Sequence, residues 1–588
     1  MVCLLTFKNQ IMKKIAYIYI IFLFLFGSCG DDIFDRQPLD KISDADVWQT
    51  PSMIDAYVTR LYTEFPFSAF NTNWATYSDE ATDHSENENA ITRGTMSRTS
   101  DPIAYWNYGY IRRINGFLEK IGDAEMIQSS KDQLEGEVRV IRAAVYFEMQ
   151  KRYGGVPLVD VVLDPFGEID KKYTRRSTEE ELADFIDSDL NIAIGLLSEN
   201  HRPPGRINKW TAYALKARAN LWTASIAKYG SVQANGLVGI PAGRTNEFFT
   251  KASAAANSVI QSGRYSLYNE HANKADNYRN IFLDEGNSEV IFERVYDGPN
   301  IGHGWITNNV PHYYSAGQGG RLNPVLEFIL GYENIDGSAN QPGLGADFLY
   351  DNGYQPFEDK DPRLRATVFF QDDDFGSDVK GMQFYDGLDP SPVPDPESIL
   401  RSATLSYNGV PTVGLGSNTA YPRRGTQSGF YLRKYIEEVP LIPNGENSTN
   451  WIAIRLAEMY LIRAEAEFEM GNPGPAATAL NATRERAGIS LVDETTLTLD
   501  HVRNERRFEL AFEGHRFWDL RRWRIAEDIL NYRFHGAYPI LHYETMKYYY
   551  LPLEVETASR TFLPQHYYNP ITDSRINNNS DLIENPGY

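Results

Sequence analysis

The fold of this chain is indicated most clearly by IRLAEMYLIRAEAEFEMGNPGPAATALNATRERAG, residues 454–488. The apolar positions of its first half recur every three or four residues, at Ile454, Ala457, Leu461, Ala464 and Phe468. That spacing places them on one face of an amphipathic helix. The glycines and proline of GNPG, residues 471–474, interrupt this helix, and the remainder returns as a second one. We therefore predict a helix–turn–helix unit.

Helical patterning of the same kind fills most of the chain. It runs to about residue 230 and resumes at Asn450, and its alanine and aromatic positions resemble those of tetratricopeptide repeats, although no exact repeat stands out. Between about residues 265 and 450, Gly, Pro, Asn and Asp interrupt short apolar pieces. We predict a mainly all-α fold: a tetratricopeptide-like helical repeat scaffold with a long loop-rich insertion lobe that carries a few short strands.

The amino terminus has the layout of an export signal. The apolar run IAYIYIIFLFLF, residues 15–26, is shorter than the roughly 20 residues that span a bilayer, and two lysines precede it. Translation is therefore expected to start at Met12. Gly27-Ser28-Cys29 resembles a bacterial lipobox, in which the cysteine is acylated. We predict that residues 1–28 are cleaved and that Cys29 anchors the protein to a membrane through lipid; the alternative is an ordinary signal with an incidental cysteine.

The composition restricts the partners and the metal sites. Lysine and arginine number 57 against 79 acids, and residues 1–28 hold three lysines and no acid, so cleavage changes the net charge from −22 to 54 − 79 = −25. A body this acidic repels phosphate backbones, so we expect no nucleic-acid partner. Because Cys3 precedes the signal, the mature chain would hold Cys29 alone, which excludes an intramolecular disulfide and a cysteine-based zinc site.

Several strings along the chain fit one known family. They are YGGVPL at 153–158, IRLAEMYLIRAEAE at 454–467, RERAGI at 484–489, ERRFELAFEGHRFWDLRRW at 505–523 and YYLPLEVE at 549–556, with VWQTPSMIDAYVTRLY at 47–62 and NPGY at 585–588 near the ends. Together and in this order they resemble the SusD/RagB nutrient-binding outer-membrane lipoproteins of the Bacteroidetes.

The resemblance implies a function and a division of the chain. It implies non-catalytic binding of an oligosaccharide or polysaccharide at the cell surface, without a cofactor, and delivery to a SusC-like TonB-dependent outer-membrane barrel. Asp31 and Asp32 are similar to the surface-export signal of these bacteria. We expect a signal peptide at 1–28, an N-terminal helical region at 29–235 and a C-terminal region at 236–588, which includes the ligand lobe at about 265–450.

Two polar stretches are candidates for the glycan site. Pyranose rings present C–H faces that pack on aromatic rings, while their hydroxyls need amide, carboxylate or guanidinium partners, and such groups are expected on exposed loops. The first stretch offers Asn71, Asn73, Trp74, Tyr77, Asp79 and Asp83. The second offers His303, Trp305, Asn308, Tyr313, Tyr314, Gln318 and Arg321. For each tryptophan the alternative is ordinary core packing.

Two groups of charged residues outside these stretches also invite a functional interpretation. Asp372-Asp373-Asp374 with Asp378 could hold a structural calcium, but the EF-hand register is missing and a solvated acidic turn is preferred. The charged residues Arg506, Arg507, Glu509, Glu513 and Arg516, taken as one helix, are expected to pair along it and between repeats.

The functional alternatives to glycan delivery are a surface glycoside hydrolase and a peptide-binding or protein-interaction lipoprotein that binds no glycan. No G-x-S-x-G, H-E-x-x-H or P-loop motif supports an enzyme.

Overall fold

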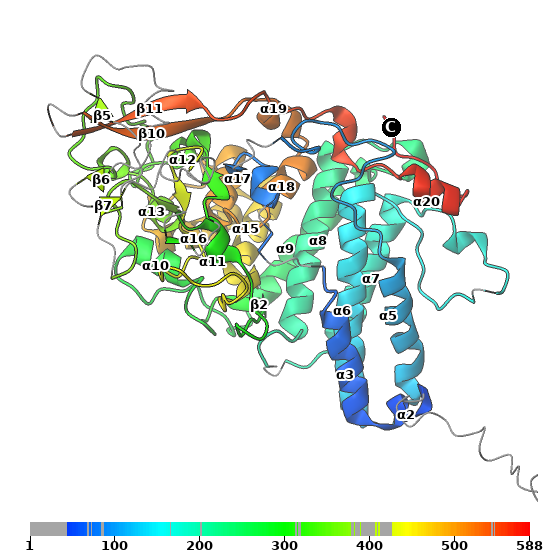
Figure 1. Ribbon diagram of the computed structural model, residues 1–588. Coiled ribbons are helices and arrows are strands. Elements are labelled where there is room, and N and C mark those ends of the chain that lie inside the picture. Colours follow the sequence, from blue (N-terminus) through cyan, green and yellow to red (C-terminus); the bar gives the residue numbers. More distant parts are fainter. Residues whose placement is uncertain are drawn as a thin grey trace, which may run out of the picture.

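A computed structural model describes residues 44–588 (Figure 1). The gaps are 67–69, 72, 84–87, 165, 200–202, 312–313, 316–318, 378–380, 383–387, 390–405, 408–409, 412–425, 543–544 and 546. The predicted signal, Cys29, Asp31 and Asp32 lie outside the described residues. In the part of the chain that is described, no helix is both long and apolar enough to span a membrane.

Helices dominate the molecule, with 45% of the residues in helix and 9% in strand, so the predicted mainly helical class is confirmed. The α-helices are α2 (Asp44–Gln49), α3 (Pro51–Tyr62), α4 (Asn73–Thr76), α5 (Tyr108–Lys120), α6 (Gln128–Tyr153), α7 (Glu179–Leu196), α8 (Lys209–Tyr229), α9 (Thr245–Ile260), α10 (Lys274–Asn280), α11 (Trp305–Asn309), α12 (Leu326–Gly331), α13 (Pro362–Thr367), α15 (Leu456–Glu469), α16 (Pro473–Ala487), α17 (Leu499–Glu509), α18 (Arg516–Arg522), α19 (Ala526–Leu530) and α20 (Asp573–Asn578).

The strands are short and pair mostly in twos. They are β1 (Ala81–Asp83), β2 (Val290–Arg294), β3 (Leu322–Pro324), β4 (Val368–Phe369), β5 (Leu388–Asp389), β6 (Ser406–Tyr407), β7 (Val410–Pro411), β8 (Tyr431–Leu432), β9 (Trp451–Arg455), β10 (His535–His542) and β11 (Lys547–Glu554). The pairs β1–β3, β2–β9, β4–β8 and β6–β7 are antiparallel. Strands β10 and β11 form an antiparallel hairpin, and β5 pairs with β10 in parallel.

The long helices pack into an array, and their ends are set by local sequence. Thr178 caps α7 through a reciprocal exchange with Glu181. Gly154 follows α6 with φ 73°, and Gly488 ends α16 in the left-handed conformation with φ 77°, which glycine adopts at little cost. Consecutive helices pack as pairs, α6 with α7 and α8 with α9, and α15 continues the array by packing on both α9 and α16 (Figure 1).

The lobe between α9 and α15 is the predicted loop-rich insertion, and Figure 1 shows it beside the upright helices. Strand β2 near its start pairs with β9 at its end, so the chain leaves the array and returns to it at neighbouring points. Its short elements enclose a separate core that is rich in buried Phe and Tyr. This arrangement confirms the predicted scaffold with an insertion.

Two helix boundaries that were predicted from sequence are wrong. By sequence, Asp101-Pro102 predicts the start of a helix that reaches Ile121. Helix α5 instead begins at Tyr108, where the side chain of Asn107 accepts a hydrogen bond from the backbone N–H of Tyr110. The sequence likewise predicts a helix over Asp500–Glu513, but α17 ends at Glu509. Phe512 and Gly514 have φ values of 59° and 82°, which turn the chain before α18 begins. The charged residues of this string therefore do not lie on one helix.

Candidate functional site

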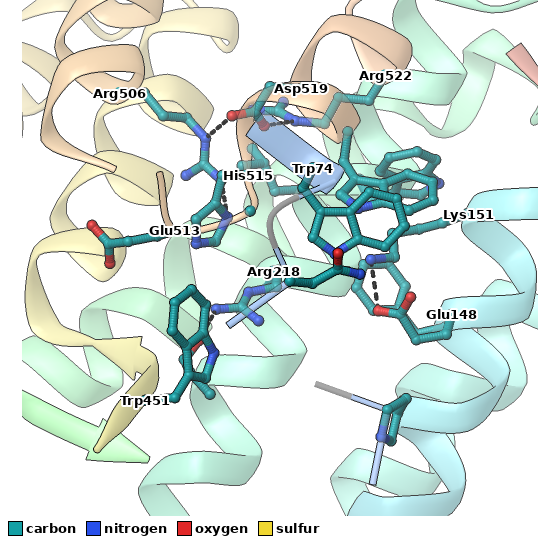
Figure 2. Close-up of a pocket in the computed structure, with 18 residues that line it drawn as sticks. Trp74, Glu148, Lys151, Arg218, Trp451, Arg506, Glu513, His515, Asp519 and Arg522 are labelled. Carbon is teal, nitrogen blue, oxygen red and sulfur yellow. Dashed lines mark hydrogen bonds and ion pairs between the residues drawn. The ribbon is translucent and has the colours of Figure 1, made fainter. Parts of the chain in front are cut away.

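A cavity of about 100 Å³ lies where the N-terminal helices meet the C-terminal segments. Helices α4, α6 and α8 supply one part of its wall, and β9, α17, α18 and the turn between the last two supply the rest. Figure 2 shows these side chains converging from elements that are distant in the sequence. The cavity is therefore a product of tertiary packing.

Aromatic rings form much of the cavity wall. The rings are Trp74, Phe147, Trp222, Trp451 and Trp518. The centroids of Trp74 and Trp518 lie 5.1 Å apart, and those of Trp222 and Trp518 lie 6.1 Å apart. Trp222, Trp451 and Trp518 are buried, whereas Trp74 is half-buried. Trp74 is thus the indole of this wall that is most open to solvent.

Lys151 places a cation inside the wall. Its Nζ lies 2.6 Å from a carboxylate oxygen of Glu148 and 4.4 Å from the centroid of the Trp518 ring, a cation–π distance. Burial lowers the pKa of Lys151 to about 8, although Glu148 opposes the shift. The ammonium is therefore present at neutral pH and lost in mildly alkaline solution.

Arg218 ties the two halves of the chain together at the cavity. Its guanidinium donates to both carboxylate oxygens of Glu458 at 2.7 and 2.6 Å, and to the backbone carbonyl of Ala453 at 2.8 Å. A bidentate ion pair of this kind fixes the orientation of the guanidinium. Helix α8 is thereby held against β9 and α15.

A second group of charges lies around α18. Asp519 accepts from Arg506 Nε at 2.9 Å and from Arg522 Nε at 2.8 Å. Arg506 Nη2 also lies 3.4 Å from Nδ1 of His515, which fits a neutral imidazole that accepts at Nδ1 (Figure 2). Burial lowers the pKa of His515 well below its ordinary value, and the cations Arg218 and Arg506 add to the shift.

The first predicted stretch reaches the cavity through Asn71 and Trp74. Asn73 is exposed at the start of α4, and Tyr77 is buried, which raises the pKa of its hydroxyl. Burial opposes ionisation of Asp79, but Arg507 and Arg516 outweigh it and lower the pKa of its carboxyl. Arg516 holds Asp79 at 2.7 Å and Arg507 at 2.8 Å. Asp79 therefore links the segment before β1 to α17 and α18.

The second predicted stretch lies next to the first, and Phe70 connects them. The centroid of the half-buried Phe70 ring lies 4.0 Å from that of His303, 5.2 Å from that of Trp305 and 5.1 Å from that of Trp451. The two candidate loops, more than 200 residues apart in sequence, thus meet at one aromatic cluster, which shares Trp451 with the cavity.

Most side chains of the second stretch are used inside the fold. Trp305 is 3% exposed and its Nε1 donates to the carbonyl of Lys434 at 3.3 Å, a placement that favours core packing over a sugar platform. Tyr314 is buried and stacks on Phe375. Arg321 is exposed and Asn308 half-buried. Tyr313 and Gln318 lie outside the described residues.

The side chain of His303 is half-buried, and its imidazole is uncharged at neutral pH. Its Nδ1 accepts from the backbone N–H of Trp305 at 3.1 Å, and its Nε2 lies 2.9 Å from the carbonyl of Thr449. Burial lowers its pKa to about 4. Both ring nitrogens are therefore occupied by the backbone of the lobe.

The acidic turn at 372–374 faces guanidinium groups. Asp373 accepts from Arg365 at 3.0 Å and from the backbone N–H of Phe370 at 2.8 Å. Asp378 lies outside the described residues. In the described ranges no group of three His, Cys, Asp or Glu side chains could hold a metal ion. The neighbouring Arg365 thus favours an ion-paired turn at this place.

Sequence reasoning missed most of the cavity wall. The residues selected from the sequence for ligand binding include Trp74 but not Trp222, Trp451 or Trp518. The charged residues near 506 were expected to pair along one helix and between repeats, and Arg506 of α17 pairs with Asp519 of α18. A signal was available, because Arg506, Trp518 and Asp519 all belong to the string at 505–523.

Known sequence families match both parts of the chain. The SusD family matches residues 288–588, and a family described as "Starch-binding associating with outer membrane" matches residues 35–221. The first match alone spans just over half of the 588 residues.

Individual proteins are similar over nearly the whole length. The SusD-like protein P38 of Formosa agariphila is 24% identical over 565 residues, 88% of this chain and 94% of that protein. A crystal structure of a SusD-like protein from Bacteroides fragilis is 27% identical with a TM-score of 0.73, and covers 94% of this chain and 100% of its own. A laminarin-binding SusD-like protein has a TM-score of 0.57 at 22% identity, over 92% of this chain and 100% of its own. The chain therefore belongs to the SusD family, whose members bind glycans without catalysing their conversion.

Proposed function

We propose that the protein binds an oligosaccharide or polysaccharide at the cell surface and delivers it to a SusC-like TonB-dependent transporter of the outer membrane. The observation that carries the glycan part is Trp74, a half-buried indole at a cavity whose wall combines aromatic rings with charged side chains. Sugar rings pack their C–H faces on such indoles, and their hydroxyls bind to neighbouring charged groups. The name of one structural relative, a laminarin-binding protein, agrees with this class of ligand.

The size of the cavity restricts how a glycan would bind. Pockets that enclose drug-sized ligands measure roughly 300–1,000 Å³, whereas this cavity measures about 100 Å³. A pyranose chain would therefore lie across the opening, against Trp74, and only a substituent would enter.

The charges of the cavity support binding over glycoside hydrolysis. A general acid needs a carboxyl whose pKa is raised towards neutrality. Burial opposes ionisation of Glu148, Glu513 and Asp519, yet neighbouring lysine and arginine side chains outweigh it and lower all three pKa values. These carboxylates are therefore suited to hold cations rather than to donate a proton.

Surface attachment and the transporter are proposed on the sequence. Cys29, in its lipobox-like setting, would carry the anchor, and the polar residues that follow would act as a tether. The family match to proteins described as associating with the outer membrane supports this location. Mass spectrometry of the mature amino terminus tests it: an unmodified Cys29 would remove the anchor from the proposal.

Calorimetry with a panel of glycans tests the binding function. Trp74→Ala should lose most of the affinity for a glycan that binds and keep the helical circular dichroism, because Trp74 is only half-buried. Trp210→Ala is the matched control, since Trp210 is also half-buried and stacks on Tyr213 away from the cavity wall. Equal affinity of the Trp74 variant and the wild type would remove Trp74 from the site, and no heat with any glycan would favour the protein-interaction alternative.

A further inference from the structure

We infer that the cavity beneath Trp74 receives an anionic substituent of the glycan, a carboxylate or a sulfate ester, so that the protein selects acidic polysaccharides. The inference rests on the proposed function and adds the class of ligand. It is carried by buried hydrogen-bond donors of the cavity wall for which the described residues supply no acceptor.

Two buried donors of the wall lack an acceptor. Trp222 Nε1 and Arg506 Nη1 have no hydrogen-bond partner among the described residues, and both residues are 3% exposed and line the cavity. Arg506 already uses Nε for Asp519 and Nη2 for His515, so Nη1 is what remains of its guanidinium. An indole N–H and a guanidinium can only donate, so the occupant that satisfies both must offer acceptors. Unpaired donors of this kind are costly when buried.

The cations of the wall outnumber its carboxylates, but most of them are paired within the protein. Four cations line the cavity, Lys151, Arg218, Arg506 and Arg522, against three carboxylates, Glu148, Glu513 and Asp519. Arg218 is bound to Glu458 and Arg522 to Glu465. The preference for an anion over a neutral hydroxyl therefore rests on the guanidinium of Arg506, whose Nη1 has no acceptor among the described residues. The carboxylates are bound to cations of the protein: Glu148 to Lys151 and Arg152, Glu513 to Lys434 and Arg455, and Asp519 to Arg506 and Arg522.

His515 lies among cations of the cavity region. Besides burial, the groups that most lower its pKa are Arg218, Arg506, Arg455 and Lys151. A carboxylate or sulfate in the cavity would accept from Arg506 and Trp222 together.

The test compares acidic and neutral glycans of equal length on the purified full chain. Titration calorimetry would use a hexamer of galacturonate, a sulfated galactan hexamer and, as the neutral arm, laminarihexaose. We expect at least one acidic hexamer to bind about tenfold or more tightly than the neutral one. The two acidic arms distinguish a carboxylate from a sulfate as the recognised group.

A conservative variant places the effect at the cavity. Trp222→Phe keeps an aromatic ring and removes the Nε1 donor, so it should weaken binding of the acidic hexamer about tenfold, and more than it weakens binding of the neutral one. Trp210→Phe is the matched control, because Trp210 Nε1 also lacks a partner in the described part of the chain, yet Trp210 does not line the cavity. Thermal melting of both variants checks that they fold.

Three outcomes overturn the inference. Neutral and acidic hexamers that bind equally would remove the acidic class and leave glycan binding intact. Preferred acidic binding that Trp222→Phe does not weaken would place recognition outside this cavity. Binding of no glycan at all would remove the proposed function and this inference with it.

Discussion

Two clusters of charged side chains in this protein are built from the same residue types but serve different ends. In the first, the buried carboxylate of Glu509 lies 2.8 Å from Arg363 and 2.5 Å from Arg455, and it also pairs with Arg486. In the second, the charges face the cavity beneath Trp74. The first joins α17 to the lobe, to β9 and to α16, whereas the second contains buried donors without an acceptor among the described residues, on side chains that line the cavity.

The comparison also shows what an unpaired donor means. Among the described residues Arg486 Nε has no partner, as is true of Arg506 Nη1, but Arg486 does not line the cavity. A buried unpaired donor is therefore an indication of a site only where it borders open space. The roles of the two clusters can be distinguished by measuring both stability and glycan binding for variants of each cluster.

The largest expected effect is on stability at the Glu509 cluster. Glu509→Gln leaves three arginines around a neutral amide, and breaking a buried ion pair of this kind costs about 3–5 kcal/mol of unfolding free energy. Urea unfolding followed by circular dichroism measures it. The control Glu485→Gln lies on the exposed face of α16 and should change little. A loss below about 1 kcal/mol would show that the cluster does not hold the segments together.

A smaller effect on stability, with a clear effect on binding, is expected at Lys151. Lys151→Met removes a desolvated cation, and Glu148 keeps Arg152 at 2.6 Å, so the unfolding free energy should change by about 1 kcal/mol or less. Affinity for an acidic hexamer should fall several-fold. Lys228→Met, whose side chain pairs with Glu469 away from the cavity wall, is the control. Unchanged affinity would contradict a role for the cavity charge.

The smallest expected effect is a pH dependence of the same binding. Because burial lowers the pKa of Lys151 to about 8, its ammonium is present below that pH and lost above it. Affinity for an acidic hexamer should therefore fall as the pH rises from 7 to 9, with no such fall in Lys151→Met. His515 stays neutral over this range because its pKa is lowered. Parallel pH profiles for wild type and variant would assign the dependence to another group.

Part of the candidate site was visible in the sequence. Trp74 was selected because an indole among Asn, Asp and Tyr in a loop fits a sugar platform, and it does line the cavity. Trp305 was selected on the same grounds, yet its ring is buried in the lobe core, with its centroid 5.2 Å from that of Phe70. The two tryptophans differ in what packs on them from distant segments, and a local pattern does not contain that information.

The sequence by itself determined the helices and the family. The three- and four-residue spacing at 454–468, the GNPG turn and the cap at Thr178 act over a few residues, so they can be recognised without knowing the rest of the fold. Only the tertiary structure decided that Trp222, Trp451 and Trp518 share a cavity, because α8, β9 and α18 meet through long-range packing. It also decided which arginine donors are satisfied, since each partner is contributed by a different segment.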